Sequence, residues 1–150
     1  MNTNWMNNKT VIITGASGGM GKGVAERLIK EHGCTVIGIA RSEEKMKKVV
    51  EELGEYADKF SYQLFDVSVE QNWIDFVTYL RDNNIHPDVL INNAGILPKF
   101  DRFQNYTIDY IKKAMDITSI RQFIQSMLFC RCFLSHQHPQ SSTLTLLRLL

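Results

Sequence analysis

The sequence predicts an α/β protein built on a Rossmann-like, doubly wound parallel sheet that is truncated to four strands in the order 3-2-1-4. Two observations support this fold. Short apolar runs suited to buried strands alternate along the chain with segments whose apolar residues recur at helical spacing. The first apolar run also leads through a glycine-rich turn directly into a helical segment, between Thr10 and Gly23. Right-handed crossovers would then place helices on both faces of the sheet.

Local signals set the boundaries of the elements. Gly33 is suited to end the first helix, and Ser42, followed by Glu43 and Glu44, is suited to begin the second. Pro87 ends the third helical segment. We predict strands at residues 11–13, 35–40, 60–65 and 89–91, and helices after the glycine turn, from Ser42 to about Leu53, from Ser68 onward, and from Tyr106 to about Cys130.

The turn from Gly15 to Gly21 has the composition of a phosphate-binding loop. Its glycines let the main chain turn tightly and approach a ligand with no Cβ in between. The helix that follows presents unpaired N–H groups and the positive end of its dipole. A tight turn without a ligand is the alternative, but four glycines in one turn need a reason for close backbone approach.

Two familiar phosphate-binding patterns do not fit this turn. A P-loop would have Gly at its first position and Ser or Thr after its Lys, where this chain has Ala16 and Gly23. The G-x-G-x-x-G fingerprint would need a third Gly in place of Val24.

A third pattern does fit. Thr14-Gly15, Gly19 and Gly21 form T-G-x-x-x-G-x-G, and Asn92-Asn93-Ala94-Gly95 follows the fourth predicted strand. Together these motifs resemble the short-chain dehydrogenase/reductase family, from residue 9 to about residue 117.

The resemblance implies a dinucleotide site beyond the carboxyl ends of the strands. Asp66 would accept a hydrogen bond from the adenine amino group, although the same carboxylate is also suited to cap the helix beyond Ser68. Asn92 would tie the central sheet together through its amide, and Ala94 with Gly95 would leave room for the ribose and nicotinamide. The predicted cofactor-binding residues are Thr14, Gly15, Ser17, Gly19, Met20, Gly21, Arg41, Ser42, Asp66, Val67, Asn92, Ala94 and Gly95.

Arg41 predicts which cofactor binds. An acidic residue at the end of the second strand would bind the ribose 2′-OH of NAD, whereas an Arg accommodates the 2′-phosphate of NADP. This strand ends in Ala40 and Arg41, so we expect NADP rather than NAD, with further contacts from Ser17, Lys22 and Ser42. The alternative for Arg41 alone is an ordinary solvated side chain.

The chain changes character after the Rossmann domain, which we place at residues 1–118. The tail, residues 119–150, follows no family motif, and no Asp or Glu occurs after Asp116. Thr118 stands where the family has an Asn. A change of reading frame near codon 118 is our hypothesis for this break. Without further strands, the fourth strand would have an open edge and the protein marginal stability, unless the tail supplies a substitute strand.

The family transfers a hydride between NADP(H) and a secondary alcohol or ketone, using a Ser, a Tyr and a Lys four residues after the Tyr. No Tyr of this chain has a Lys four residues later. We therefore predict no catalytic residues and no turnover. The alternatives are a non-catalytic NADP-binding module, a subunit that pairs through the helix beginning near Tyr106, or a product with no role.

Composition excludes several other classes of function. The formal net charge of +1 provides no general attraction to nucleic acid or anionic lipid. Three cysteines and the lack of a leader-like or membrane-spanning apolar run favour the cytoplasm. Cys130-x-Cys132 and His136-x-His138 lack the usual zinc spacing, so we predict no metal. Residues 144–150 are too short to span a bilayer and are expected to be a sticky end or to pack on the open sheet edge.

Overall fold

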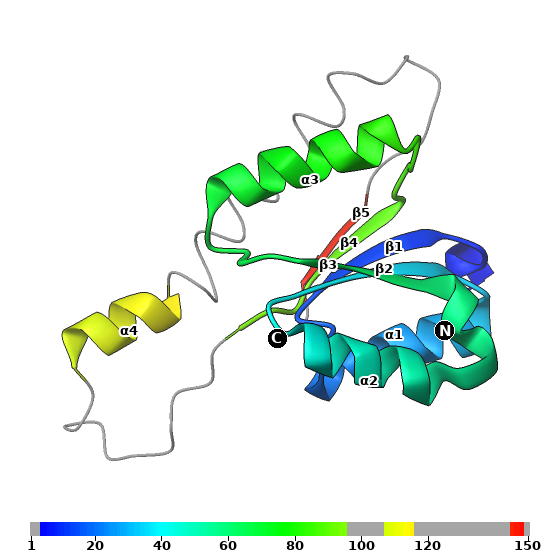
Figure 1. Cartoon of the computed structure of the whole chain (residues 1–150), viewed down its shortest axis with the longest axis horizontal. Helices are drawn as coiled ribbons and strands as arrows, with labels where there is room; N and C mark the ends of the chain where they lie inside the picture. The colour runs from blue at the N-terminus through cyan, green and yellow to red at the C-terminus, as the bar shows by residue number, and fades with distance from the viewer. Residues whose placement is uncertain (1–3, 96–106, 116–144, 149–150) are drawn as a thin grey trace.

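The computed structural model describes residues 4–95, 107–115 and 145–148, which form one parallel sheet with its helices (Figure 1). The strands are β1 (Thr10–Thr14), β2 (Thr35–Ala40), β3 (Phe60–Leu64), β4 (Val89–Asn92) and β5 (Thr145–Arg148). The helices are α1 (Gly19–His32), α2 (Glu43–Leu53), α3 (Glu70–Asp82) and α4 (Ile108–Met115), with 3-10 turns η1 (Asn4–Met6) and η2 (Gly54–Lys59). The strand order is β3-β2-β1-β4-β5, which confirms the predicted order 3-2-1-4 and adds a fifth strand.

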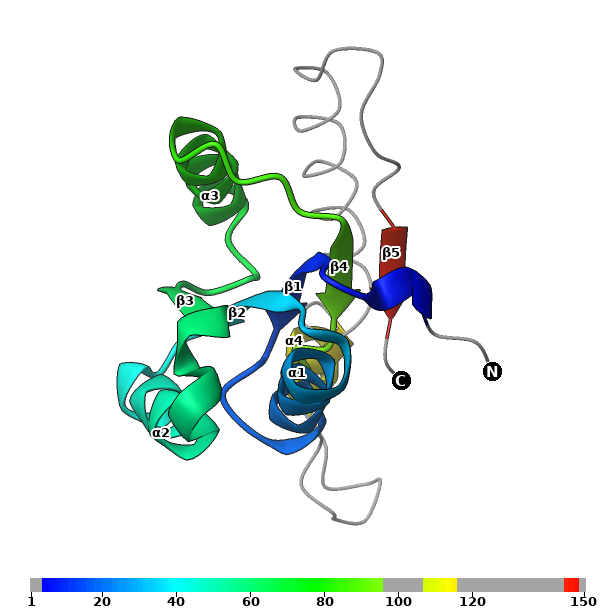
Figure 2. The same cartoon turned by 90° about the vertical axis from the view of Figure 1, so that its right-hand side faces the viewer.

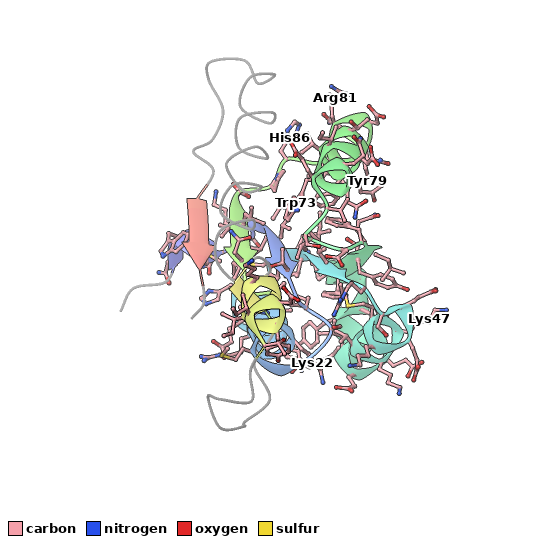
Figure 3. The ribbon with its side chains drawn as sticks, turned by 90° about the vertical axis from the view of Figure 1, so that its left-hand side faces the viewer. Lys22, Lys47, Trp73, Tyr79, Arg81 and His86 are labelled. Atoms are coloured by element: carbon pink, nitrogen blue, oxygen red, sulfur yellow. The ribbon has the colours of Figure 1, made fainter. Side chains whose placement is uncertain are left out.

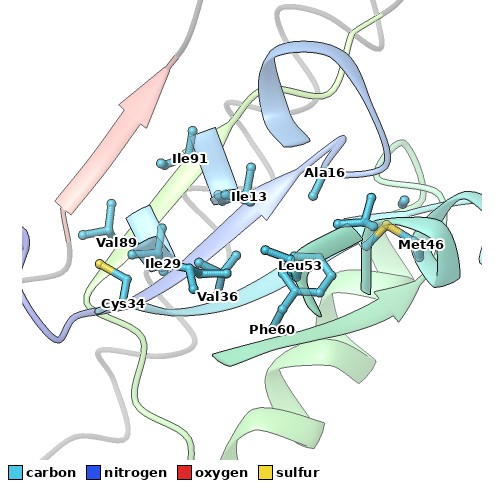
Figure 4. Packing of buried hydrophobic residues seen from close by; sticks show 14 of the residues in the cluster. Ile13, Ala16, Ile29, Cys34, Val36, Met46, Leu53, Phe60, Val89 and Ile91 are labelled. Carbon is cyan, nitrogen blue, oxygen red and sulfur yellow. The ribbon is translucent and has the colours of Figure 1, made fainter. Parts of the chain in front are cut away.

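Helices pack on both faces of the sheet because its central strands are apolar on both faces. Along β1, Val11 and Ile13 belong to the core under α1 and α2, whereas Ile12 belongs to the core under α3. Figure 2 shows α1 and α2 on one side of the sheet and α3 on the other. The larger cluster, drawn in Figure 4, includes Ile29 of α1, Met46 and Leu53 of α2, and Val36, Phe60, Val89 and Ile91 of the strands.

The smaller core beneath α3 is rich in aromatic side chains. Trp73, Phe76 and Leu80 pack there, and Phe65 meets Trp73 edge to face with ring centroids 5.5 Å apart. A buried indole needs a partner for its N–H group, and Trp73 Nε1 donates to the carbonyl of Val67 at 3.0 Å. This hydrogen bond fixes the loop between β3 and α3 against the core.

Two predicted helix ends are confirmed. Gly33 has a left-handed conformation, with φ of 63°, and ends α1 while its N–H donates to the carbonyl of Ile29 at 3.0 Å. At the start of α2, the Ser42 hydroxyl accepts a hydrogen bond from the N–H of Lys45 at 3.4 Å.

Two other helix starts differ from prediction. Helix α3 begins at Glu70 rather than Ser68, because Asp66 Oδ1 accepts hydrogen bonds from the Ser68 N–H (2.9 Å) and hydroxyl (2.7 Å) and closes a turn before the helix. Helix α4 begins at Ile108, after Thr107 Oγ1, which accepts from the N–H of Tyr110 at 3.2 Å. The predicted continuation to Cys130 lies outside the described residues.

The C-terminal segment supplies the strand that β4 would otherwise lack. Strand β5 pairs with β4 in parallel, and its register joins Val89 to Thr145 and Asn92 to Arg148. Of the two expectations for this segment, packing on the sheet edge is therefore the one that the structure shows.

Candidate functional site

The predicted site segments meet at one edge of the sheet. All paired strands run parallel, so the turn after β1, Arg41 after β2, Asp66 after β3 and the loop from Asn92 to Gly95 lie at the same edge. The β1 and β4 segments are in direct contact, since a methyl group at Gly15 would lie 2.9 Å from the Cα of Ala94.

The positions of the turn require glycine for different physical reasons. Gly15 and Gly19 have φ angles of 70° and 55°, where other residues are strained. Gly21 has no room for a side chain, because a Cβ there would lie 2.5 Å from the carbonyl oxygen of Gly15. Gly18, in contrast, has no other atom within 4 Å of where a Cβ would be. The turn is therefore packed on its inner side and open at Gly18.

The N-terminus of α1 is suited to bind an anion. This helix is the only one of the four helices in the described residues without an acidic residue in its first turn. Its N-cap is Gly18, which has no side chain to accept from the helix N–H groups. The N–H groups of Gly19, Met20 and Gly21 have no partner within the helix, because the first bond of the helix is that from Lys22 N–H to Gly18. This end of α1 can donate to a phosphate.

A hydrogen-bond network joins this turn to the loop after β4. The fully buried Thr14 hydroxyl accepts from the N–H groups of Asn93 (3.0 Å) and Ala94 (2.9 Å). Asn93 Nδ2 also donates to the carbonyls of Thr14 (3.0 Å) and Gly15 (3.3 Å). The ends of β1 and β4 are thereby fixed relative to each other.

Asn93 was not among the predicted site residues. The contacts just described join the side chain of Asn93 to the end of β1, and the role expected of the Asn92 amide in the central sheet stays a prediction. The N-N-A-G motif contained the signal, since both of its Asn residues follow the strand. That the Asn93 side chain reaches the carbonyls of Thr14 and Gly15 depends on the packing of the two strand ends, which the sequence does not state.

Arg41 and Asp66 are neighbours at the ends of β2 and β3. Arg41 Nη1 lies 3.9 Å from Asp66 Oδ2, and the Arg41 side chain is 70% exposed. The other oxygen, Asp66 Oδ1, is engaged by Ser68. Asp66 thus closes the turn before α3, whose N-cap is Val69, instead of capping the helix as considered above; its role toward the adenine stays a prediction. The Ser42 hydroxyl, proposed as a further contact, caps α2.

Lys22 is already engaged by carboxylates. Its ammonium group is bonded to Glu52 of α2 and lies 3.5 Å from Glu26. The hydrogen bond to Glu52 raises the pKa of Lys22 above its ordinary value of 10.5. We expected Lys22 to add a contact to phosphate, whereas the structure shows it linking α1 to α2. Figure 3 places Lys22 far from Arg81 of α3.

The remaining predicted residues surround the same edge. Val67 is buried in the core under α3, so only its main chain is available to a ligand. Met20 is 63% exposed at the start of α1, and Gly95 is exposed after the β4 loop. Ser17 is partly buried within the turn.

Comparison with known proteins identifies the family to which this chain belongs. A family model described as short chain dehydrogenase matches residues 9–139. The chain belongs to the short-chain dehydrogenase family. The match extends past residue 117, where the motifs noted above end.

Two relatives of this short-chain dehydrogenase chain illustrate the similarity. It is 31% identical over 126 residues to NADPH-dependent pterin aldehyde reductase of Arabidopsis thaliana, which covers 80% of this chain and 51% of that protein. It is 37% identical over 87 residues to serine 3-dehydrogenase of Rhizobium radiobacter, covering 58% of this chain and 33% of that protein. The chain therefore spans about half, or less, of these relatives.

Solved structures of short-chain dehydrogenases share the fold. A Shigella flexneri short chain dehydrogenase complexed with NADP has a TM-score of 0.77 at 21% identity, covering 98% of this chain and 60% of that one. A Bacillus anthracis short chain dehydrogenase has a TM-score of 0.73 at 27% identity, covering 87% and 51%.

Two further expectations concern metal ligands and membrane-spanning helices. The Cys130–Cys132 and His136–His138 pairs lie outside the described residues; within those residues, no His, Cys, Asp and Glu side chains group as metal ligands would. Across the same part of the chain, every helix is too short or too polar to cross a membrane.

Proposed function

We propose that this short-chain dehydrogenase chain binds NADP(H) at the carboxyl edge of its sheet and does not reduce carbonyl compounds by itself. The observation that carries the proposal is the turn from Gly15 to Gly21, which lies between β1 and α1 and packs against the loop after β4. Its open side, at Gly18, exposes the uncapped start of α1, and this combination suits the pyrophosphate of a dinucleotide.

The residues present fit the rest of the cofactor. Asp66 and the main chain of Val67 lie at the end of β3, where the adenine would be held. Arg41 is exposed at the end of β2, and no acidic residue ends that strand. A guanidinium group there favours a 2′-phosphate, so we propose NADP over NAD. Ala94 and Gly95 would adjoin the nicotinamide half.

The bound nicotinamide would supply the hydride of the family's reaction. The protein would have to supply the proton at the substrate oxygen, and the chain has no Tyr with a Lys four residues later. Removing a general acid or base alone lowers rates by about 10²–10⁴-fold. We therefore propose cofactor binding without turnover.

Family membership supports a second candidate, namely hydride transfer between NADP(H) and a secondary alcohol or ketone. A non-catalytic subunit that pairs through α4 is a variant of our proposal, supported by Ile108 of that helix being 71% exposed. Sedimentation of the purified chain would show the pairing, and the assays below separate binding from turnover.

The deciding experiment titrates the full chain with NADPH and NADH by fluorescence. We expect NADPH to bind more tightly than NADH, and Arg41→Asp to lose this preference. Arg81→Asp, which reverses the charge of another exposed arginine, should keep the preference and serves as the matched control. Arg81 lies on α3, far from Lys22 of α1, the helix that begins at the glycine turn (Figure 3). Absence of binding to either nucleotide would disprove the proposal. Reduction of a panel of ketones and aldehydes above the rate without protein would instead favour the second candidate.

A further inference from the structure

Met20 is an exposed methionine at the turn that the cofactor would contact. It is the second residue of α1, and its side chain is 63% exposed. Met6 and Met46, the other methionines whose side chains the structure describes, are buried. A thioether that solvent reaches is open to oxidants, whereas one enclosed in a core is protected. Of these three residues, Met20 is therefore the one that an oxidant can attack.

The side chain of Met20 adjoins the open part of the glycine turn. Side chains of an α-helix lean toward its N-terminus, which for Met20 is the side of Gly18 and Gly19. Apart from neighbours in the chain and in the helix, neither glycine has an atom within 4 Å of where a Cβ would be, so the space there is open. The N–H groups of Gly19, Met20 and Gly21, which have no partner within the helix, lie at the same place. Met20 thus adjoins the donors that suit the pyrophosphate.

Oxidation would change Met20 from an apolar side chain to a polar one. Hydrogen peroxide transfers one oxygen atom to Sδ: the O–O bond breaks, an S–O bond forms and water leaves, so the sulfur loses the two electrons that the peroxide gains. The thioether sulfur is a weak hydrogen-bond acceptor, whereas the sulfoxide oxygen is a strong one. On a flexible side chain beside the start of α1, that oxygen competes with a phosphate for the same N–H groups.

We propose that Met20 is an oxidation site that controls dinucleotide binding: its sulfoxide lowers the affinity of the chain for NADP(H), and bound nucleotide shields the thioether. The inference rests on the proposed function, because it assumes that the pyrophosphate lies at the start of α1. Methionine sulfoxide reductases reverse this modification, so the control is reversible.

Peptide mapping of the full chain treated with hydrogen peroxide tests the site itself. The tryptic peptide of residues 10–22 contains Met20 and no other methionine, so its gain of one oxygen atom measures the modification directly. We expect Met20 to be oxidised faster than Met6 and Met46, and saturating NADP⁺ to slow its oxidation. Dithiothreitol, added after the peroxide, reverses the reversible oxidation of cysteines before any measurement.

Fluorescence titration with NADPH tests the consequence. We expect complete oxidation of Met20 to weaken binding roughly two- to tenfold, the factor that corresponds to one hydrogen bond. Met20→Leu keeps every other methionine and all three cysteines, so its own affinity, whatever its value, should be the same before and after peroxide. Met20→Gln has a polar side chain that resembles the sulfoxide, and it should bind NADPH more weakly than Met20→Leu without any oxidant.

The possible outcomes separate this inference from the function on which it rests. If the untreated wild-type chain binds no NADPH, the proposed function and the inference both fail. If it binds NADPH and the oxidised chain binds it equally well, only the inference fails. The same holds if peroxide costs Met20→Leu as much affinity as the wild type, or if Met20 reacts no faster than the buried methionines. Thermal melting checks that the oxidised chain is folded; if it is not, the comparison of Met20→Gln with Met20→Leu decides.

Discussion

Asn93 and Thr14, which are 79 positions apart in the sequence, are joined by two hydrogen bonds, and Asn93 is the donor in both. The Asn93 side chain donates to the Thr14 carbonyl at 3.0 Å, and the Thr14 hydroxyl accepts from the Asn93 N–H at 3.0 Å. A polar group buried this deeply must be paired to be tolerated. The pair therefore sets the relative position of the glycine turn and the β4 loop, the two walls of the proposed site.

Replacing Thr14 with Val should show the strength of this connection. Val has nearly the shape of Thr, but it leaves the N–H groups of Asn93 and Ala94 without their acceptor. We expect the free energy of unfolding in urea to fall by about 1–3 kcal/mol. Thr14→Ser, which keeps the hydroxyl, should lose clearly less; equal losses in the two variants would show that packing, and not the hydroxyl, is responsible.

Two glycines near the start of α1 should respond to Ala in opposite ways. At Gly21 a Cβ would contact Asn93 Nδ2 and the carbonyl oxygen of Gly15, so Gly21→Ala should destabilise the protein by about 1–3 kcal/mol and weaken NADPH binding. At Gly23, an exposed helical position, no atom lies within 4 Å of the new Cβ. Gly23→Ala should stabilise by up to about 1 kcal/mol. Chemical denaturation of both variants checks the difference in sign.

The negative charge of Asp66 should limit the preference for NADPH. Its carboxylate is close enough to Arg41 to offset part of the positive field that a 2′-phosphate would experience. The 3.9 Å contact does little to immobilise the Arg41 side chain, because that side chain is largely exposed. We expect Asp66→Asn to raise the ratio of NADPH to NADH affinity roughly two- to fivefold at low salt, and less at high salt. An equal weakening of both cofactors would instead indicate that Asp66 acts only on the adenine.

The ion pair between Lys22 and Glu52 predicts a dependence of stability on pH. The pKa of Lys22 is higher in the folded state than its ordinary value of 10.5. Lys22 therefore contributes its full stabilisation below pH 10.5, and this is lost as the pH rises through the elevated pKa. The difference in urea midpoint between wild type and Lys22→Gln should be constant near neutral pH and shrink in strong alkali. A difference that persists there would mean that the charge of Lys22 is not what matters.

Strand β5 should keep the protein monomeric at the β4 edge. A chain shortened to end at Leu144 exposes the unpaired main chain of β4, and such edges associate with one another. We expect this chain to melt at a lower temperature and to self-associate in sedimentation experiments. A chain that ends at Arg148 retains β5 and serves as the control. If both shortened chains behave alike, the pairing of β5 is not what protects the edge.

Local patterns in the sequence were sufficient for most of the fold. Apolar runs marked the strands, and Gly33 and Ser42 marked helix ends, because caps depend on residues within one turn. The start of α3 was displaced because a hydroxyl residue is equally suited to cap a helix or to complete an Asp turn, and Ser68 does the latter. The involvement of Lys22 with Glu52 could not be predicted, because it depends on how α1 and α2 pack.

The sequence by itself determined the place of the glycine turn, which follows from hydrophobic periodicity, and its motifs predicted the order of the first four strands through their resemblance to a Rossmann-like family. It also determined that Arg41 ends the second strand. Only the tertiary structure decided that Asn93 holds the turn, that Asp66 faces Arg41 and that residues 145–148 pair with β4. These contacts join residues that are distant in the chain, and their partners are selected by packing, which no local pattern specifies.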